Sequence, residues 1–196
     1  ARIHNMAFFW AIWGWLVSFF SLFTFWLSIL FTLPLKDYEI LWILIPVWMN
    51  LFFTDFYQEK KGTDYGSAIT NGVAMLWVGI DWVRFLIREL SGRGMTFSKV
   101  FSSNILILKF ALSAFVLIAG VIIMIEGIKG IKFVRVVGRV RNTSYLLLVL
   151  SPVIYGLAQF SWRYLLAITL FFPVYYFVIE LIDRFVPDPK VMGKRD

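Results

Sequence analysis

Two charged residues lie inside a stretch that is otherwise apolar enough to cross a bilayer. Asp81 and Arg84 belong to the segment from Ser67 to Leu90 and are three residues apart, so on a helix they share a face and can pair. A charge placed in hydrocarbon is costly even on the most lenient insertion scale. We therefore expect this face of the helix to contact protein or water.

Helical spacing divides the segment 67–90 into two faces. The first face carries small, polar and charged residues: Ser67, Thr70, Ala74, Trp77, Asp81, Arg84 and Arg88. The second face is apolar throughout: Val73, Leu76, Ile80, Val83 and Ile87. We expect the first face to point into a helix bundle and the second to point to lipid.

Lys109 lies in the next apolar segment, at a depth similar to that of Asp81. With a helical rise of ~1.5 Å per residue, both lie roughly 10–13 Å below the same membrane surface. We expect Asp81 to lie between Arg84 and Lys109, where two bases would keep it ionised rather than let it carry a proton. Such a cluster can be an ion-pair clasp that holds two helices in register, or a charged constriction on a transport path.

Polar residues at other depths bear on the choice between an ion-pair clasp and a transport path. Asn50, Asn71 and Glu180 fall in three different apolar segments. A transport pathway needs polar groups at several depths, whereas a scaffold needs only one cluster. The spread therefore favours a pathway that these residues line together with the charged cluster.

Carboxylates gather in the polar segment that follows the second apolar stretch. Asp55, Glu59 and Asp64 can supply the oxygen ligands that a divalent cation prefers. Lys60 and Lys61 lie between them and favour a solvated loop whose charges pair with one another. We expect no bound metal and no cofactor, with these three acids as the candidates if a metal binds.

A basic stretch covers residues 126–144. Four of its cations fall within one helical arc: Lys129, Lys132, Arg135 and Arg139. This pattern predicts an amphipathic segment on the anionic cytoplasmic leaflet, where the cations contact lipid headgroups. The alternative is that the charges only set the topology. A nucleic-acid partner is not expected, because no folded cytoplasmic domain would present such a surface.

Composition excludes several kinds of chemistry. The chain has no cysteine, which excludes disulfides and thiolate catalysis, and its one histidine is His4 near the N-terminus. The sequence has no histidine–carboxylate pair, no serine in a nucleophile-elbow setting and no paired aspartates. We therefore assign no catalytic residues.

Membrane helices must position these residues. The chain of 196 residues is 60% hydrophobic and 16% charged, whereas soluble domains are about half apolar. It is predicted to be an all-α integral membrane protein with one polytopic domain, residues 1–196, that forms a bundle of about six transmembrane helices. The predicted spans are residues 8–33, 38–57, 67–90, 102–125, 145–160 and 164–181.

Charge distribution predicts the orientation of these spans. Lys and Arg concentrate in the N-terminus, the loop 55–67, the stretch 126–144 and the C-terminal tail. By the positive-inside rule, both termini are cytoplasmic and the protein lies in the cell membrane. The span 145–160 is short and contains Ser151-Pro152. A re-entrant hairpin formed with 164–181 is the alternative, and it leaves the C-terminus on the same side.

The function expected from these features is a small channel- or transporter-like protein for an ion or small solute. It would work as a homo-oligomer or as a subunit of a membrane complex, because 196 residues make a thin wall for a pathway. One alternative is a non-catalytic scaffold or assembly subunit that docks a partner through the charged stripe. A lipid-handling enzyme is the third possibility.

Overall fold

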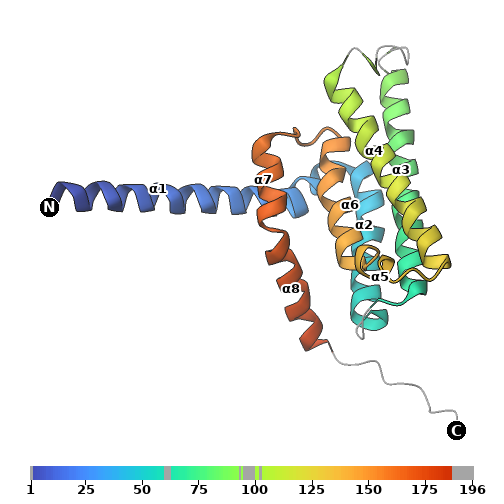
Figure 1. Cartoon of the computed structure of the whole chain (residues 1–196). Helices are drawn as coiled ribbons and strands as arrows, with labels where there is room; N and C mark the ends of the chain where they lie inside the picture. Colours follow the sequence, from blue (N-terminus) through green and yellow to red (C-terminus); the bar gives the residue numbers. More distant parts are fainter. Residues whose placement is uncertain (1, 60–62, 93, 95–99, 102, 187–196) are drawn as a thin grey trace, which may run out of the picture.

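The computed structural model is helical, with no strand among the residues it describes, which are 2–59, 63–92, 94, 100–101 and 103–186 (Figure 1). The long helices are α1 (Arg2–Leu27), α2 (Tyr38–Phe53), α3 (Tyr65–Gly92), α4 (Asn104–Ile128), α6 (Val140–Ile154), α7 (Trp162–Leu170) and α8 (Phe172–Phe185). Short elements join them: η1 (Ser28–Thr32), η2 (Pro34–Lys36), η3 (Thr54–Gln58) and α5 (Val134–Val137).

Within the described part of the chain, four helical segments are long and apolar enough to cross a membrane: Trp13–Thr32, Tyr38–Gln58, Asn104–Ile128 and Trp162–Phe185. The prediction of an all-helical membrane protein is confirmed at this level. The other two predicted spans give a weaker signal, because α3 carries charges in its second half and α6 has only 15 residues.

Helix α6 is the centre of the bundle. Every residue from Thr143 to Ile154 except Leu146 is buried, and α6 packs against α2, α3, α4 and α8. A central helix needs no lipid-facing side, so it can keep polar residues that bond to its own backbone. Ser151 does so: its hydroxyl donates to the Leu147 carbonyl oxygen at 2.7 Å.

Glycines let α3 and α4 approach until their backbones touch. A Cβ atom on Gly120 would lie 2.9 Å from the Gly72 carbonyl oxygen and 3.1 Å from the Leu76 nitrogen. Gly79 and Gly127 follow seven residues later, and a Cβ on either would meet a side chain of the opposite helix. In a lipid bilayer the hydrophobic effect does not drive helices together, so van der Waals contacts from such close packing stabilise the helix pair.

This packing corrects the predicted faces of α3. The face that packs on the bundle is a third one: Ala68, Asn71, Gly72, Met75, Gly79, Trp82 and Leu86. In the stripe predicted to point inward, Ser67 and Asp81 are buried, whereas Trp77, Arg84 and Arg88 are exposed. The apolar face is open at Val73, Ile80 and Ile87, as expected. Helical periodicity correctly grouped the residues of α3 into faces. The face that packs against the bundle is the one with the small residues Ala68, Gly72 and Gly79.

The basic stretch 126–144 is not one amphipathic helix. Helix α4 continues to Ile128, Gly130 turns the chain at a φ of +68°, and α5 has only four residues. Helix α6 then begins at Val140, five residues before the predicted span, and ends at Ile154 rather than at 160. The last predicted span is also divided, because α7 ends at Leu170 and α8 begins at Phe172.

Helix α1 leaves the bundle across its axis and projects away from it (Figure 1). Its C-terminal part is anchored to the bundle, where the indole of Trp26 donates to the Tyr145 hydroxyl at 3.0 Å and Phe23 packs edge-on against Phe171. Arg163 donates to the Ser21 hydroxyl at 2.9 Å. In the part of α1 from Trp13 to Phe20, large apolar side chains such as Trp15 and Phe20 are exposed.

The contact between α3 and α4 yields a first prediction. Gly120→Ala places a methyl group against backbone atoms that cannot rotate away, so the two helices must separate, at a cost of about 1–3 kcal/mol. Thermal unfolding in detergent should show the loss. Gly14→Ala is the matched control, because nothing lies within 4 Å of its added Cβ. Equal effects of both substitutions would contradict close packing at Gly120.

Candidate functional site

A buried arginine joins three elements at one end of the bundle. Arg141 is 1% exposed, and its Nε donates to the Asp55 carboxylate at 2.7 Å. Its Nη1 donates to Glu180 at 2.5 Å, and Asp183 lies 3.7 Å from its Nη2. We name these four residues the Arg141 cluster; they come from η3, α6 and α8.

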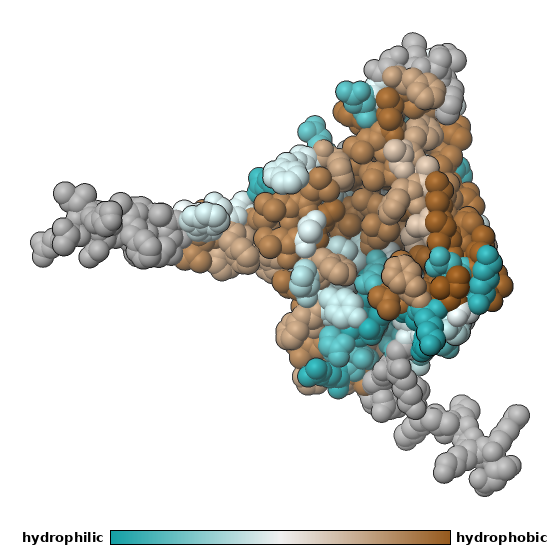
Figure 2. Space-filling model, viewed as in Figure 1, coloured by the Kyte–Doolittle hydropathy of each residue, from teal (hydrophilic) through white to brown (hydrophobic). Residues whose placement is uncertain are grey.

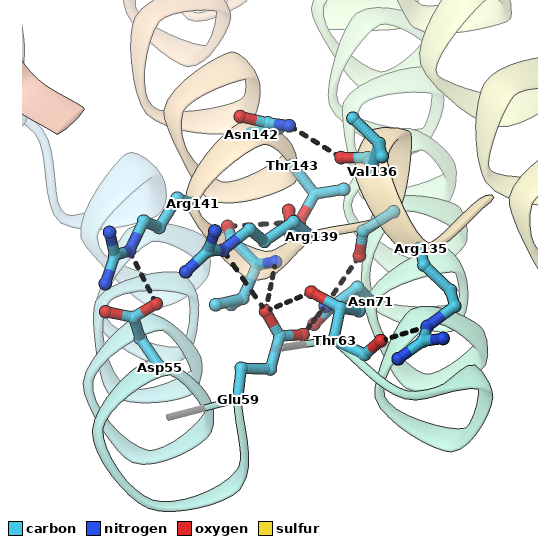
Figure 3. A network of polar contacts seen from close by, with 12 residues as sticks. Asp55, Glu59, Thr63, Asn71, Arg135, Val136, Arg139, Arg141, Asn142 and Thr143 are labelled. Atoms are coloured by element: carbon cyan, nitrogen blue, oxygen red, sulfur yellow. Dashed lines mark hydrogen bonds and ion pairs between the residues drawn. The ribbon is translucent and has the colours of Figure 1, made fainter. Parts of the chain in front are cut away.

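Glu59 is the centre of a second set of bonds beside this cluster (Figure 3). Its carboxylate accepts from the Thr63 hydroxyl at 2.9 Å, the Asn71 amide at 3.1 Å and the Val140 backbone nitrogen at 3.2 Å. The Nε of Arg139 lies 4.0 Å away. Glu59 therefore holds the start of α6 against the start of α3.

Asn71 extends this network along the bundle. Its amide also donates to the Gly138 carbonyl oxygen at 2.8 Å, and its side-chain oxygen accepts from Asn50 at 3.2 Å. Asn50 in turn accepts from the Thr54 hydroxyl at 3.0 Å. The two asparagines predicted to line a pathway are thus brought together, with hydrogen bonds to each other and to their neighbours.

Burial raises the pKa of Glu59 above its ordinary value. The bonds from Thr63, Val140 and Asn71 act in the opposite direction because they favour the charged carboxylate. Burial has the larger effect, since Glu59 is only 1% exposed.

The three candidate metal ligands have separate partners. Asp55 pairs with Arg141, and Glu59 bonds to Thr63, Asn71 and Val140. Asp64 caps α3 by accepting from the Ser67 backbone nitrogen at 2.6 Å. Within the described residues no group of three or more acids or histidines is arranged to hold a metal ion. Lys60 and Lys61 lie outside those residues.

A different polar cluster occupies the opposite end of α3. Asp81 pairs with Arg84, as the spacing predicts, and also accepts from the Tyr155 hydroxyl at 2.7 Å. Lys109 is buried, and its ion pair is with Glu89 at 3.6 Å. The structure therefore brings Lys109 beside α3 at the expected end, with Glu89 as the acid that it pairs with.

The four predicted headgroup cations have different environments. Lys129 and Lys132 are exposed. Arg135 donates from its Nε to the Thr63 carbonyl oxygen at 2.7 Å and is otherwise exposed. Arg139 is turned inward, because it donates to the Tyr176 hydroxyl at 2.6 Å and approaches Glu59.

Sequence reasoning missed Arg141 as a site residue. It belongs to a run of basic residues that gives no sign of which member is buried. Glu180, which the sequence predicts as part of a pathway, forms an ion pair with Arg141. The available signal was the run of polar residues from Arg141 to Ser144, which lies in the first turns of α6 and leads into its apolar part.

Comparisons with known proteins add no assignment to this geometry. No family model, no curated protein and no solved structure matches this chain.

The buried ion pair gives a second prediction. Arg141→Met leaves the Asp55 carboxylate buried without its cation, so the free energy of unfolding should fall by about 3–5 kcal/mol. Asp55→Asn together with Arg141→Met should cost less than the sum of the two single changes. Unfolding in detergent measures both. Arg184→Met is the control, because that exposed arginine lies 4.0 Å from the Glu180 carboxylate and should change little.

The raised pKa of Glu59 gives a third prediction. Below about pH 4.5 the carboxyl is protonated in the folded and unfolded states alike. As pH rises, the unfolded chain releases this proton first, so stability falls until the raised pKa is passed. Glu59→Gln should remove this part of the pH dependence of the melting temperature. Identical profiles for the two proteins between pH 4 and 7 would contradict the raised pKa.

Proposed function

We propose that the chain is a multi-pass protein of the cell membrane with six spans and cytoplasmic termini, and that it works as an assembly subunit. Support for this topology comes from the end of the bundle where η3, α5, the start of α6 and the end of α8 meet. These elements flank or contain the basic segments that the positive-inside rule assigns to the cytoplasm. Hydrophilic side chains gather over this end in Figure 2, below a largely hydrophobic surface.

The observation that carries the proposal is that, among the described residues, the charged side chains and asparagines inside the bundle gather in two separate clusters near opposite ends of α3. On α3, Asn71 belongs to one cluster and Asp81 to the other, and the buried Met75 and Val78 lie between them. On α6, the apolar pair Leu147–Leu148 occupies the same interval. A conduction path needs polar groups that follow one another through the bilayer. This arrangement instead favours a clasped bundle that presents its surface to another subunit.

Helix α1 is the element suited to that contact. Its sequence is largely apolar from Met6 onward, and Trp13, Trp15, Val17 and Phe20 are more than half exposed. A groove of 530 Å³ runs between α1 and α7, with Val17, Leu22 and Leu166 among the residues that line it. In this proposal α1 is the first of the six spans. Among the side chains of α1 that the structure describes, those that contact the bundle belong to its last turns, so in this proposal the partner sets the direction of α1 in the bilayer.

We expect the partner to be a second copy of this chain, and cysteine cross-linking tests it. The sequence has no cysteine, so a single Val17→Cys supplies the only thiol. In native membranes a short bis-maleimide should join Val17→Cys into a covalent dimer. Ile118→Cys is the control, since it is similarly exposed at 60% but lies on α4. Equal cross-linking at both positions, or a monomer mass in nanodiscs, would contradict self-assembly.

The transport function expected from the sequence stays a prediction, and flux measurements distinguish it from assembly. The purified protein in liposomes is tested with chloride, potassium and protons, beside Asp81→Asn and Lys109→Met. We expect no flux, because an apolar interval separates the two clusters. A flux whose selectivity changes in either variant would favour transport and contradict the assembly proposal.

A further inference from the structure

Two cavities meet at the start of α6. The first is an apolar groove of 410 Å³ whose floor is α6 and whose walls are α4 and the α7–α8 segment. Phe115 and Ala119 line one wall, and Ile168 and Phe172 line the other. The second is a pocket of 420 Å³ lined by Lys132, Arg135, Arg139, Asn142 and Tyr176, with Thr63 and Val136. Asn142 lines both cavities, so they adjoin.

The charged side chains that line the pocket are all positive. Its lining carries three cations and no acid. Two of the cations are held by bonds that leave nitrogens available, because Arg135 uses its Nε for the Thr63 carbonyl and Arg139 uses one Nη for the Tyr176 hydroxyl. Lys132 is exposed and has no ion pair within the part of the chain that the structure describes. Fixed arginines and a free ammonium are suited to a phosphate group.

The groove is suited to a hydrocarbon chain. Its two walls, α4 and α7–α8, belong to the segments apolar enough to cross a membrane, so it opens towards lipid. Its volume lies within the range of about 300–1,000 Å³ typical of ligand sites. Lipid chains fill such a groove without losing contact with the bilayer, whereas a free phosphate would leave it empty.

We propose that the groove and the pocket form one binding site for an anionic phospholipid, with its phosphate on Lys132, Arg135 and Arg139 and one hydrocarbon chain between α4 and α7–α8. Charge complementarity selects an anionic over a zwitterionic headgroup, and the adjoining apolar groove selects a lipid over soluble phosphate. The site does not depend on the proposed assembly, because none of its residues lies on α1. It places the predicted headgroup contacts in one defined pocket, and Lys129 is outside it.

Native mass spectrometry of the detergent-purified protein tests the site, with phosphatidylglycerol and phosphatidylcholine of identical chains as probes. We expect phosphatidylglycerol to be retained and phosphatidylcholine to be lost. Lys132→Met should weaken phosphatidylglycerol binding about five-fold, as one cation near a lipid surface does. Lys129→Met is the matched control and should leave binding unchanged. An equal loss in both variants would show diffuse attraction to the basic surface and overturn the site.

The groove has its own pair of variants. Ala119→Phe should block the hydrocarbon chain and remove the retained lipid. Ala114→Phe adds the same ring to an exposed position of α4 that does not line the groove, and should leave the retained lipid in place. Circular dichroism confirms that each variant is folded. Retention by Ala119→Phe, or equal retention of the two lipids by the unchanged protein, would overturn the proposal.

Discussion

A guanidinium that is 1% exposed is the strongest constraint on this bundle. A buried cation without an anion is strongly destabilising, so wherever Arg141 lies, carboxylates must reach it. Asp55 reaches it from η3, and Glu180 and Asp183 reach it from α8. The ends of three elements far apart in the sequence are thereby fixed together. The basic stretch itself is interrupted at Gly138, which follows α5, and its last arginine lies buried in α6.

The close approach of α3 and α4 fixes the other side of the bundle. Gly72 and Gly120 allow their backbones to touch, which decides the rotation of α3 about its axis. That rotation turns Asn71 towards α6 and leaves Arg84 at the surface. Helix α6 can then be the central helix although it is short, because neighbours cover nearly all of it.

These two constraints shape the surfaces that remain. The polar groups pair at the two ends, and the interval between them is apolar. On one side α4 and α7–α8 stay apart and leave a groove that leads to the basic pocket. On another side α1 projects, and its C-terminal part is anchored at Ser21, Phe23 and Trp26. These two surfaces are the ones on which the proposed lipid site and the proposed subunit contact rest.

The sequence by itself determined the helical membrane class and the Asp81–Arg84 pair, because composition and a period of 3.6 residues act within a single helix. It also placed Lys109 beside the charged end of α3. Only the tertiary structure decided that Lys109 pairs with Glu89, that Arg141 rather than its neighbours is buried, and that α6 is central. Pairs between helices depend on how each helix is rotated and where it crosses the next. Backbone contact at Gly72 and Gly120 sets the rotation and crossing of α3 and α4. The periodicity of a single segment carries no information about this contact between two helices.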